Sequence, residues 1–187
     1  MTLGDDRPFA ASGVRDDLID RARAGDAQAF TQLLQESDDR MRRLGYRLMR
    51  STAAMEDALQ DAYLKAYRSI GSFEHQSKFS TWLYSIVYRT CLDAIRYQDR
   101  RPVEQLNPGL AEPDHFVDQV VAANSVHQAL DRLPVDQRAA LLLVDDEGLS
   151  FAEAASVLDI PVGTAASRVS RARQTLRSDL QLKDQWA

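Results

Sequence analysis

The sequence predicts an all-α protein in which a flexible linker joins two small helical domains, the second of them a helix-turn-helix domain. Apolar residues recur at steps of three and four along most of the chain, whereas alternating strand patterns are scarce. The stretch RRPVEQLNPGLAEPDHF holds three prolines and a glycine, which is typical of a linker. We therefore expect a disordered start over residues 1–11, a first domain over 12–98, a linker over 99–115 and a second domain over 116–187.

Composition limits the classes of function. The formal charge of −5 argues against a strong DNA-binding protein that acts alone, because phosphate contacts are made by Lys and Arg, but it is compatible with a DNA binder held by a partner. The single cysteine, Cys91, allows no intramolecular disulfide and fits a reducing compartment. There is no signal-peptide pattern and no apolar run near the ~18 residues that span a bilayer. We expect a cytoplasmic protein without membrane insertion.

The stretch STAAMEDALQDAYLKAYRSIGSF predicts a helix with two distinct faces. One face is apolar and predicts burial: Met55, Leu59, Ala62 and Ala66. The other is polar with one leucine in it: Asp57, Gln60, Asp61 and Leu64. A metal or acid–base site at Asp57 and Asp61 is disfavoured because no His or third carboxylate lies at ligand spacing. We expect a protein-docking surface, with no metal, no cofactor and no catalytic residue.

The stretch KFSTWLYSIVYRTCLDAIRYQDRR predicts a long helix that follows the loop GSFEHQSK. One set of side chains is expected to face inward: Phe79, Trp82, Leu83, Ile86 and Val87. Tyr84, Tyr88 and Arg89 fall on other faces. Aromatic residues interleaved with arginines suit single-stranded nucleic acid, because bases stack on the rings. The alternative is that the aromatics belong to the core, which we favour for Trp82 and leave open for the two tyrosines.

The stretch GLSFAEAASVLDIPVGTAASRVSRARQTL predicts a helix-turn-helix. Ser150 and Glu153 form a capping box that begins a short helix, and its apolar face is expected at Phe151, Ala154, Ala155 and Leu158. Pro161 disfavours helix before it, Gly163 permits a tight turn, and Thr164 can cap the next helix. The preceding stretch ALDRLPVDQRAALLLVDDEG predicts another amphipathic pair, which completes a small four-helix domain.

The second helix of this motif has an apolar face and an exposed face. At 100° per residue the inward face comprises Ala165, Val169, Ala172, Leu176 and Leu180. The outward face comprises Ser167, Ser170, Arg171, Gln174 and Ser178, with Ala166 and Arg177 at its edges. Arg168 and Arg173 lie on the flanks, where they would reach phosphates rather than bases. A plain amphipathic hairpin with a solvated arginine face is the alternative, but the cap, the turn and the arginine cluster together favour DNA.

These motifs, in this order, resemble the extracytoplasmic-function (ECF) group of bacterial RNA polymerase sigma factors. DALQDAYLKAYRSIGSF is similar to the helix of that family that binds core polymerase. FSTWLYSIVYRTCLDAIR is similar to its promoter-melting and minus-10-reading helix. LDRLPVDQRAALLLVDDEGLSFAEAASVLDIPVGTAASRVSRARQTL is similar to its minus-35-binding domain. The resemblance extends from about Ala22 to Leu180, except for the linker.

The resemblance implies roles for individual residues. The residues expected to meet the coiled coil of the polymerase β′ subunit are Asp57, Gln60, Asp61 and Leu64. The loop Gly71–Lys78 is expected to capture a base flipped out of the minus-10 duplex, and the residues assigned to minus-10 DNA are Ser72, Phe73, His75, Lys78, Tyr84, Tyr88 and Arg89. Those assigned to minus-35 DNA are Thr164, Ala166, Ser167, Arg168, Ser170, Arg171 and Arg173.

The resemblance also implies partners and leaves alternatives. The expected partners are core RNA polymerase, through its β′ and β subunits, promoter DNA and an anti-sigma factor, and no catalysis by the chain itself is expected. Ala166 and Ser170 are smaller than the residues that the family often has there, which leaves Arg171 as the main base-reading candidate. The alternatives are a stand-alone helix-turn-helix transcriptional regulator and a helical enzyme that uses Asp57 and Asp61. The docking helix combined with the aromatic–arginine helix favours a sigma factor.

Overall fold

The computed structural model describes residues 9–100 and 128–180, and every regular element in these two ranges is helical. The elements in chain order are α1 (Phe9–Arg23), α2 (Ala27–Gln35), α3 (Asp38–Met49), α4 (Thr52–Ser69), the 3-10 turn η1 (Ile70–Ser72), α5 (Phe79–Arg100), α7 (Val135–Leu141), the π-helical turn η2 (Leu142–Asp146), α8 (Phe151–Leu158) and α9 (Val162–Leu180). Residues 128–132 are also helical. Most of the expected disordered start and linker lies outside the described residues, although α1 begins at Phe9 and α5 continues to Arg100.

The first domain has a core that α3, α4 and α5 share. Its fully buried side chains include Met41 and Leu44 from α3, Leu59 from α4, and Leu83 and Val87 from α5. The apolar stripe expected on α4 is confirmed, because all four of its residues are buried. Each large aliphatic side chain in such a core contributes about 1.5–3 kcal/mol through burial. This packing leaves the opposite face of α4 free for other contacts.

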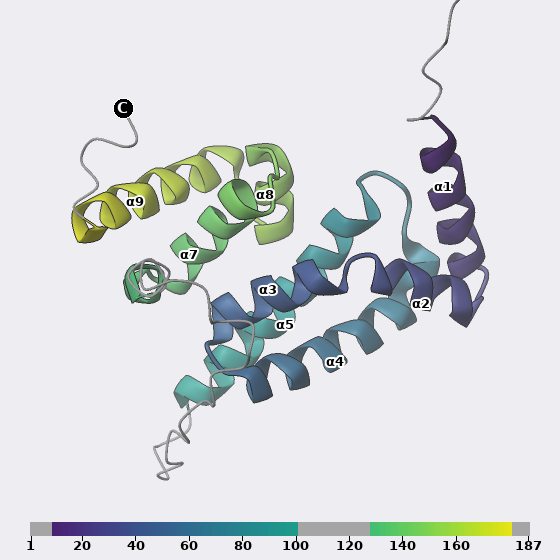
Figure 1. Ribbon diagram of the computed structural model, residues 1–187, viewed down its shortest axis with the longest axis horizontal. Coiled ribbons are helices and arrows are strands. Elements are labelled where there is room, and N and C mark those ends of the chain that lie inside the picture. The colour runs from purple at the N-terminus through teal and green to yellow at the C-terminus, as the bar shows by residue number, and fades with distance from the viewer. Residues whose placement is uncertain (1–8, 101–127, 181–187) are drawn as a thin grey trace, which may run out of the picture.

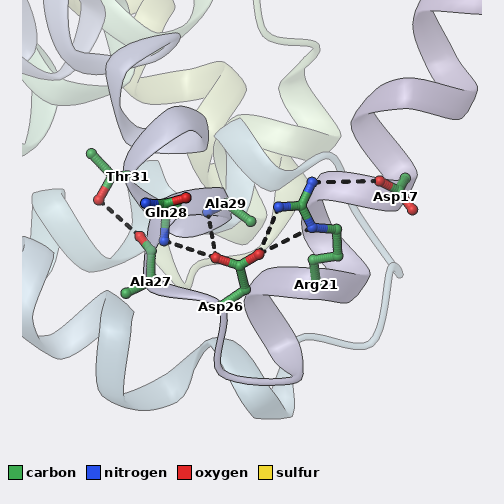
Figure 2. A network of polar contacts seen from close by, with 7 residues as sticks. All are labelled: Asp17, Arg21, Asp26, Ala27, Gln28, Ala29 and Thr31. Atoms are coloured by element: carbon green, nitrogen blue, oxygen red, sulfur yellow. Dashed lines mark hydrogen bonds and ion pairs between the residues drawn. The ribbon is translucent and has the colours of Figure 1, made fainter.

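The corner between α1 and α2 is held by one carboxylate (Figure 2). Asp26 accepts hydrogen bonds from the backbone N–H groups of Gln28, at 2.9 Å, and Ala29, at 3.1 Å, and so caps α2. Its other oxygen accepts from Arg21 Nη2 at 2.6 Å, which ties the last turns of α1 to the same carboxylate. These donors lower the pKa of Asp26, the Ala29 N–H most and the Arg21 guanidinium next.

The second domain contains the helix-turn-helix, and its first cap is confirmed. The Ser150 hydroxyl accepts from the Glu153 N–H at 3.2 Å, and the Glu153 carboxylate accepts from the Ser150 N–H at 2.9 Å. Ala154 and Ala155 are buried as expected, which lets α9 approach α8. Phe151, by contrast, is 39% exposed and does not belong to the buried face. It is the first residue of α8 and precedes the turns that pack on α9.

The turn between α8 and α9 differs from our expectation at two residues. Asp159, with φ of +56°, adopts the left-handed conformation that ends α8, while Gly163 already lies inside α9. Thr164 does not cap α9, because this helix begins at Val162 and the Thr164 N–H donates to the Pro161 carbonyl at 2.9 Å. A short polar residue such as Asp tolerates the left-handed region, which frees the glycine from that role.

The two domains lie against each other. Figure 1 shows α7, α8 and α9 as one group, green to yellow, beside α3 and α5 of the first domain. α8 packs on α5 and α7 packs on α3. Buried apolar residues of both domains consequently form one continuous cluster. One face of α5 is therefore covered by the second domain instead of facing solvent.

Candidate protein and nucleic-acid interfaces

The four residues expected to form a docking surface lie together on the solvent-facing side of α4. Asp57, Gln60 and Asp61 are exposed, and the Leu64 side chain is 50% exposed. No ion pair within the described part of the chain involves either carboxylate. Two unneutralised carboxylates beside an exposed leucine form a surface that a basic and partly apolar partner would complement.

Contacts with α3 hold α4 in place. The Arg42 guanidinium of α3 donates to Asp38 at 2.6 Å and also pairs with Glu56 at the start of α4. The Tyr63 hydroxyl donates to the same Asp38 at 2.7 Å. Burial, followed by this hydrogen bond, raises the pKa of Tyr63, so its hydroxyl stays protonated and remains a donor. The polar face of α4 is therefore presented by a helix with a fixed rotation about its axis.

The loop between η1 and α5 is anchored by an aromatic cluster. Phe73 is only 3% exposed, and its ring centroid lies 5.4 Å from that of Trp82 and 6.2 Å from that of Phe79. His75 has a φ of +55°, and its Nε2 lies 3.2 Å from Asp20 Oδ1 of α1. Ser72, His75 and Lys78 are exposed, whereas Phe73 supports the loop from beneath. Three of the four loop residues assigned to DNA thus have accessible side chains.

The tyrosines of α5 are buried in this structure, as in the core alternative that the sequence left open for them, and their assignment to minus-10 DNA stays a prediction. Tyr84 is 1% exposed and Tyr88 is 5% exposed, while Trp82, which we expected in the core, is only partly buried. The Tyr84 hydroxyl donates to Glu147, which directly follows η2. Burial is the main cause of a raised pKa for both tyrosines. The second domain covers this face, and the helical period of α5 alone could not reveal it.

Arg89 is the member of the α5 set that stays accessible. Its side chain is 58% exposed, and its Nη2 lies 3.5 Å from Asp159 Oδ2 at the end of α8. Lys78, at the other end of the covered face, lies 3.5 Å from Glu153. Lys78 and Arg89, both assigned to minus-10 DNA, are therefore paired with carboxylates of the second domain.

The arginines of α9 differ in their surroundings. Arg173 donates to both oxygens of Asp145, from Nε at 3.0 Å and from Nη2 at 2.5 Å, and this hydrogen bonding raises its pKa. Arg168 lies 3.2 Å from Asp136. Arg171 is exposed, and no ion pair within the described residues involves it. Of the three, Arg171 is the one whose guanidinium fork is available to a base edge.

The remaining minus-35 candidates follow the expected faces of α9. Ser167 and Ser170 are exposed, whereas Thr164 and Ala166 are half-buried. The inward face is confirmed at Ala165, Val169 and Ala172, which are fully buried. Within the described residues no group of three or more His, Cys, Asp or Glu side chains could hold a metal ion, and no helix is long and apolar enough to cross a membrane. The exposed polar strip on α9 is narrow, with Arg171 near its centre.

Comparison with known proteins decides the family. Two family models match the chain: Sigma-70 region 2 over residues 33–101 and Sigma-70, region 4 over residues 123–176. The ECF RNA polymerase sigma factor SigM of Mycobacterium tuberculosis is 41% identical over 153 residues, which cover 82% of this chain and 78% of the relative. The chain belongs to the ECF family of RNA polymerase sigma factors.

Other relatives of this sigma factor are similar to it in sequence or structure over more than four fifths of its length. The RNA polymerase sigma-H factor of Pseudomonas aeruginosa is 34% identical, with 88% of this chain and 92% of the relative covered. Among solved structures, the sigma factor RpoE in complex with the anti-sigma factor NepR from Bartonella quintana has a TM-score of 0.70 at 27% identity, covering 84% of this chain and 100% of that chain. The two helical domains described above thus correspond to region 2 and region 4.

The sigma factor brings together residues that the sequence analysis did not connect. Glu147 and Asp159 of region 4 contact the α5 face of region 2, and Arg138 of α7 reaches α3. All three lie in the stretch that resembles the minus-35-binding domain, but off the helix face expected to meet DNA, so the sequence assigns them no role. The acidic run Asp145–Glu147 in VDDEG was the available signal, since three consecutive acids beside a predicted DNA-binding motif are unfavourable unless they have a basic partner.

Proposed function

We propose that this sigma factor docks on core RNA polymerase through the polar face of α4. The observation that carries the proposal is the presence of two carboxylates without an ion pair in the described residues, beside the half-exposed Leu64, on a helix that polar contacts join to α3. In the family this helix meets the coiled coil of the β′ subunit. A charged surface that is already ordered loses little conformational entropy on binding, which favours affinity.

We further propose how the protein contacts promoter DNA. The exposed loop residues Ser72, His75 and Lys78 and the α5 face would hold the opened minus-10 strand. The polar strip of α9, with Arg171 at its centre, would contact the minus-35 major groove. In this scheme the protein is a transcription initiation factor without catalysis of its own, because the polymerase forms the phosphodiester bonds. Its place of action is the cytoplasm, where the polymerase acts.

We also propose that an anti-sigma factor controls the protein. RpoE from Bartonella quintana is seen in complex with the anti-sigma factor NepR, and its similarity to this chain covers both domains together. A stand-alone transcriptional regulator is not favoured, because relatives that are 41% and 34% identical to this chain are RNA polymerase sigma factors.

The α4 docking surface is tested by charge reversal. We expect Asp61→Arg to weaken binding to core RNA polymerase about tenfold or more, which corresponds to at least ~1.4 kcal/mol, because it would place a cation against a basic partner surface. Binding is measured by titration of fluorescent sigma factor with core enzyme, and transcription from a dependent promoter is measured in parallel.

The control is Asp16→Arg, which makes the same charge change at an exposed residue of α1 without an ion pair in the described part of the chain. Both variants should keep the wild-type unfolding temperature, because exposed substitutions change stability by under ~0.5 kcal/mol. Equal affinities for Asp61→Arg and Asp16→Arg would show that α4 is not the docking surface.

A further inference from the structure

The ion pairs that join regions 2 and 4 all have the same polarity. In every such pair within the described residues, the cation belongs to region 2 and the carboxylate to region 4. The pairs are Arg47–Asp146 at 2.8 Å, Arg50–Asp131 at 2.8 Å, Lys78–Glu153 at 3.5 Å and Arg89–Asp159 at 3.5 Å. A basic surface of one domain therefore faces an acidic surface of the other, and the acidic surface belongs to the domain that should bind DNA.

Two of these ion pairs and one further hydrogen bond engage residues assigned to minus-10 DNA. Lys78 pairs with Glu153, Arg89 pairs with Asp159, and the Tyr84 hydroxyl donates to Glu147. Each acceptor is a carboxylate oxygen, which is an anion like the phosphate oxygens that Lys, Arg and Tyr contact in nucleic acids. Tyr88 is buried on the same helix face. Nucleic acid and region 4 would thus need the same side chains and cannot occupy this face together.

At the boundary between the domains, some buried polar atoms lack hydrogen-bond partners among the described residues, which is rare inside a stable protein core. Arg138 is buried and donates from Nη2 to the Leu48 carbonyl at the end of α3 at 2.9 Å. Its Nη1 lies 3.8 Å from Asp131 Oδ1, beyond hydrogen-bond distance, and neither Nη1 nor Nε makes a hydrogen bond to the described residues. Glu147 has one oxygen bound by Tyr84 and a second, buried oxygen that also lacks a donor there. Buried charges with incomplete hydrogen bonding destabilise an interface, and separation of the domains would return both groups to water.

We infer that Glu147, Glu153 and Asp159, here called the acidic latch, are an internal mimic of DNA phosphates that occupies the minus-10 face of region 2 and is displaced by promoter DNA. The inference rests on the proposed function, in which the α5 face binds the opened strand. It gives the closed chain a low affinity for DNA. Ionic strength or a competing polyanion shifts the chain toward an open form, because exposed ion pairs are screened.

The test removes the latch charges with little disturbance of the fold. The latch variant is Glu147→Gln/Glu153→Gln/Asp159→Asn. Gln is accepted in a capping box, and Asn tolerates the left-handed conformation of residue 159. The control variant, Asp16→Asn/Glu36→Gln/Asp39→Asn, neutralises three exposed carboxylates away from the boundary, so the two variants have the same net charge.

Two quantities are measured on the full-length proteins. Small-angle X-ray scattering gives the radius of gyration, and fluorescence anisotropy gives the affinity for a 12-nucleotide single-stranded DNA of mixed sequence. We expect the latch variant to have a larger radius of gyration than wild type and to bind the oligonucleotide at least tenfold more tightly. The control variant should stay closed and bind within about twofold to threefold of wild type. Wild type in 0.5 M salt should also expand.

Each result that contradicts the acidic latch overturns a different part of the proposal. A latch variant with the wild-type radius of gyration overturns the latch but leaves the DNA assignment of α5 intact. Equal DNA affinity of the latch and control variants overturns it too, because the gain would then be a general charge effect. A latch variant that opens without gaining DNA affinity overturns both the mimicry and the proposed minus-10 face. The α4 docking proposal is decided separately by the polymerase titration.

Discussion

Arg171 and Arg173 lie two positions apart on α9 but have different electrostatic surroundings. Arg173 is fixed by a bidentate contact with Asp145, so its charge is already neutralised within region 4. Arg171 is exposed without an ion pair in the described residues. The sequence assigns both arginines to minus-35 DNA, Arg171 as a base reader and Arg173 as a phosphate contact, and their spacing on the helix says nothing about a carboxylate 28 positions from Arg173. The contact with Asp145 means that Arg173 joins α9 to η2 within region 4.

This difference gives a prediction for the two arginines. Arg171→Ala should cost about 1–3 kcal/mol of binding at one promoter position and relax the sequence preference there. Arg173→Ala should change binding similarly for all sequences and lower the stability of region 4 by up to ~1 kcal/mol, which is the usual limit for a partly exposed ion pair. The measurement is transcription or polymerase binding on a set of minus-35 variants, with thermal unfolding as the control. A uniform loss for Arg171→Ala would contradict its role as a base reader.

Turn residues show where local sequence rules were insufficient. The glycine rule selected Gly163 for the tight turn, whereas the left-handed residue is Asp159, four positions earlier. Propensity allows both types of residue in the left-handed conformation, and the residue that adopts it is the one that ends α8. The capping box at Ser150 and Glu153 was predictable, in contrast, because both of its partners lie within one helical turn.

At the scale of elements, the corner between α1 and α2 depends on the charge of Asp26 (Figure 2). Its pKa lies below the ordinary value, so its contribution is present above the unfolded pKa and is lost as the pH falls through the folded pKa. Asp26→Asn keeps a good N-cap but removes the charge that pairs with Arg21. We expect a lower urea midpoint than wild type at pH 7 and a difference that shrinks below about pH 4. A difference that does not vary with pH would assign the effect to the cap hydrogen bonds alone.

The faces of helices were the most predictable feature at this scale. The buried stripe and the polar face of α4 both follow from the 3.6-residue period, since the helices against which α4 packs most extensively, α3 and α5, belong to its own domain. The 3.6-residue period predicted the buried residues of α5 less well. This helix is buried on one side by its own domain and on another by α8, so Tyr84 and Tyr88 are inside the molecule although they are off the apolar stripe.

At the scale of the whole molecule, the rate at which Cys91 is alkylated distinguishes separation of the two domains from unfolding of region 2. This thiol is fully buried next to Gly45 of α3, within the core of region 2 rather than at the boundary with region 4. Burial raises its pKa to about 12, so the reactive thiolate is scarce near neutral pH. We expect slow alkylation at pH 8 in wild type and in the open latch variant, and fast alkylation in urea. Fast labelling of the latch variant would mean that opening disrupts region 2 itself.

The acidic composition also acquires a physical meaning at this scale. A net charge of −5 is unfavourable for a chain that must approach phosphates. The acids of region 4 that face region 2, however, neutralise its basic residues in the closed form. The charge that argued against a DNA binder acting alone is thus partly the charge that keeps this chain closed.

The sequence by itself determined the helical class, the two domains, the polar face of α4, the capping box of α8 and the inward face of α9. These features depend on contacts within a few helical turns or on ordered motifs, and such contacts leave a periodic pattern in the chain. Only the tertiary structure decided that the α5 face assigned to minus-10 DNA is covered and that Arg173 is neutralised. Tyr84 meets Glu147 across 63 positions of sequence, and a pairing between two helix surfaces at that separation leaves no periodic trace.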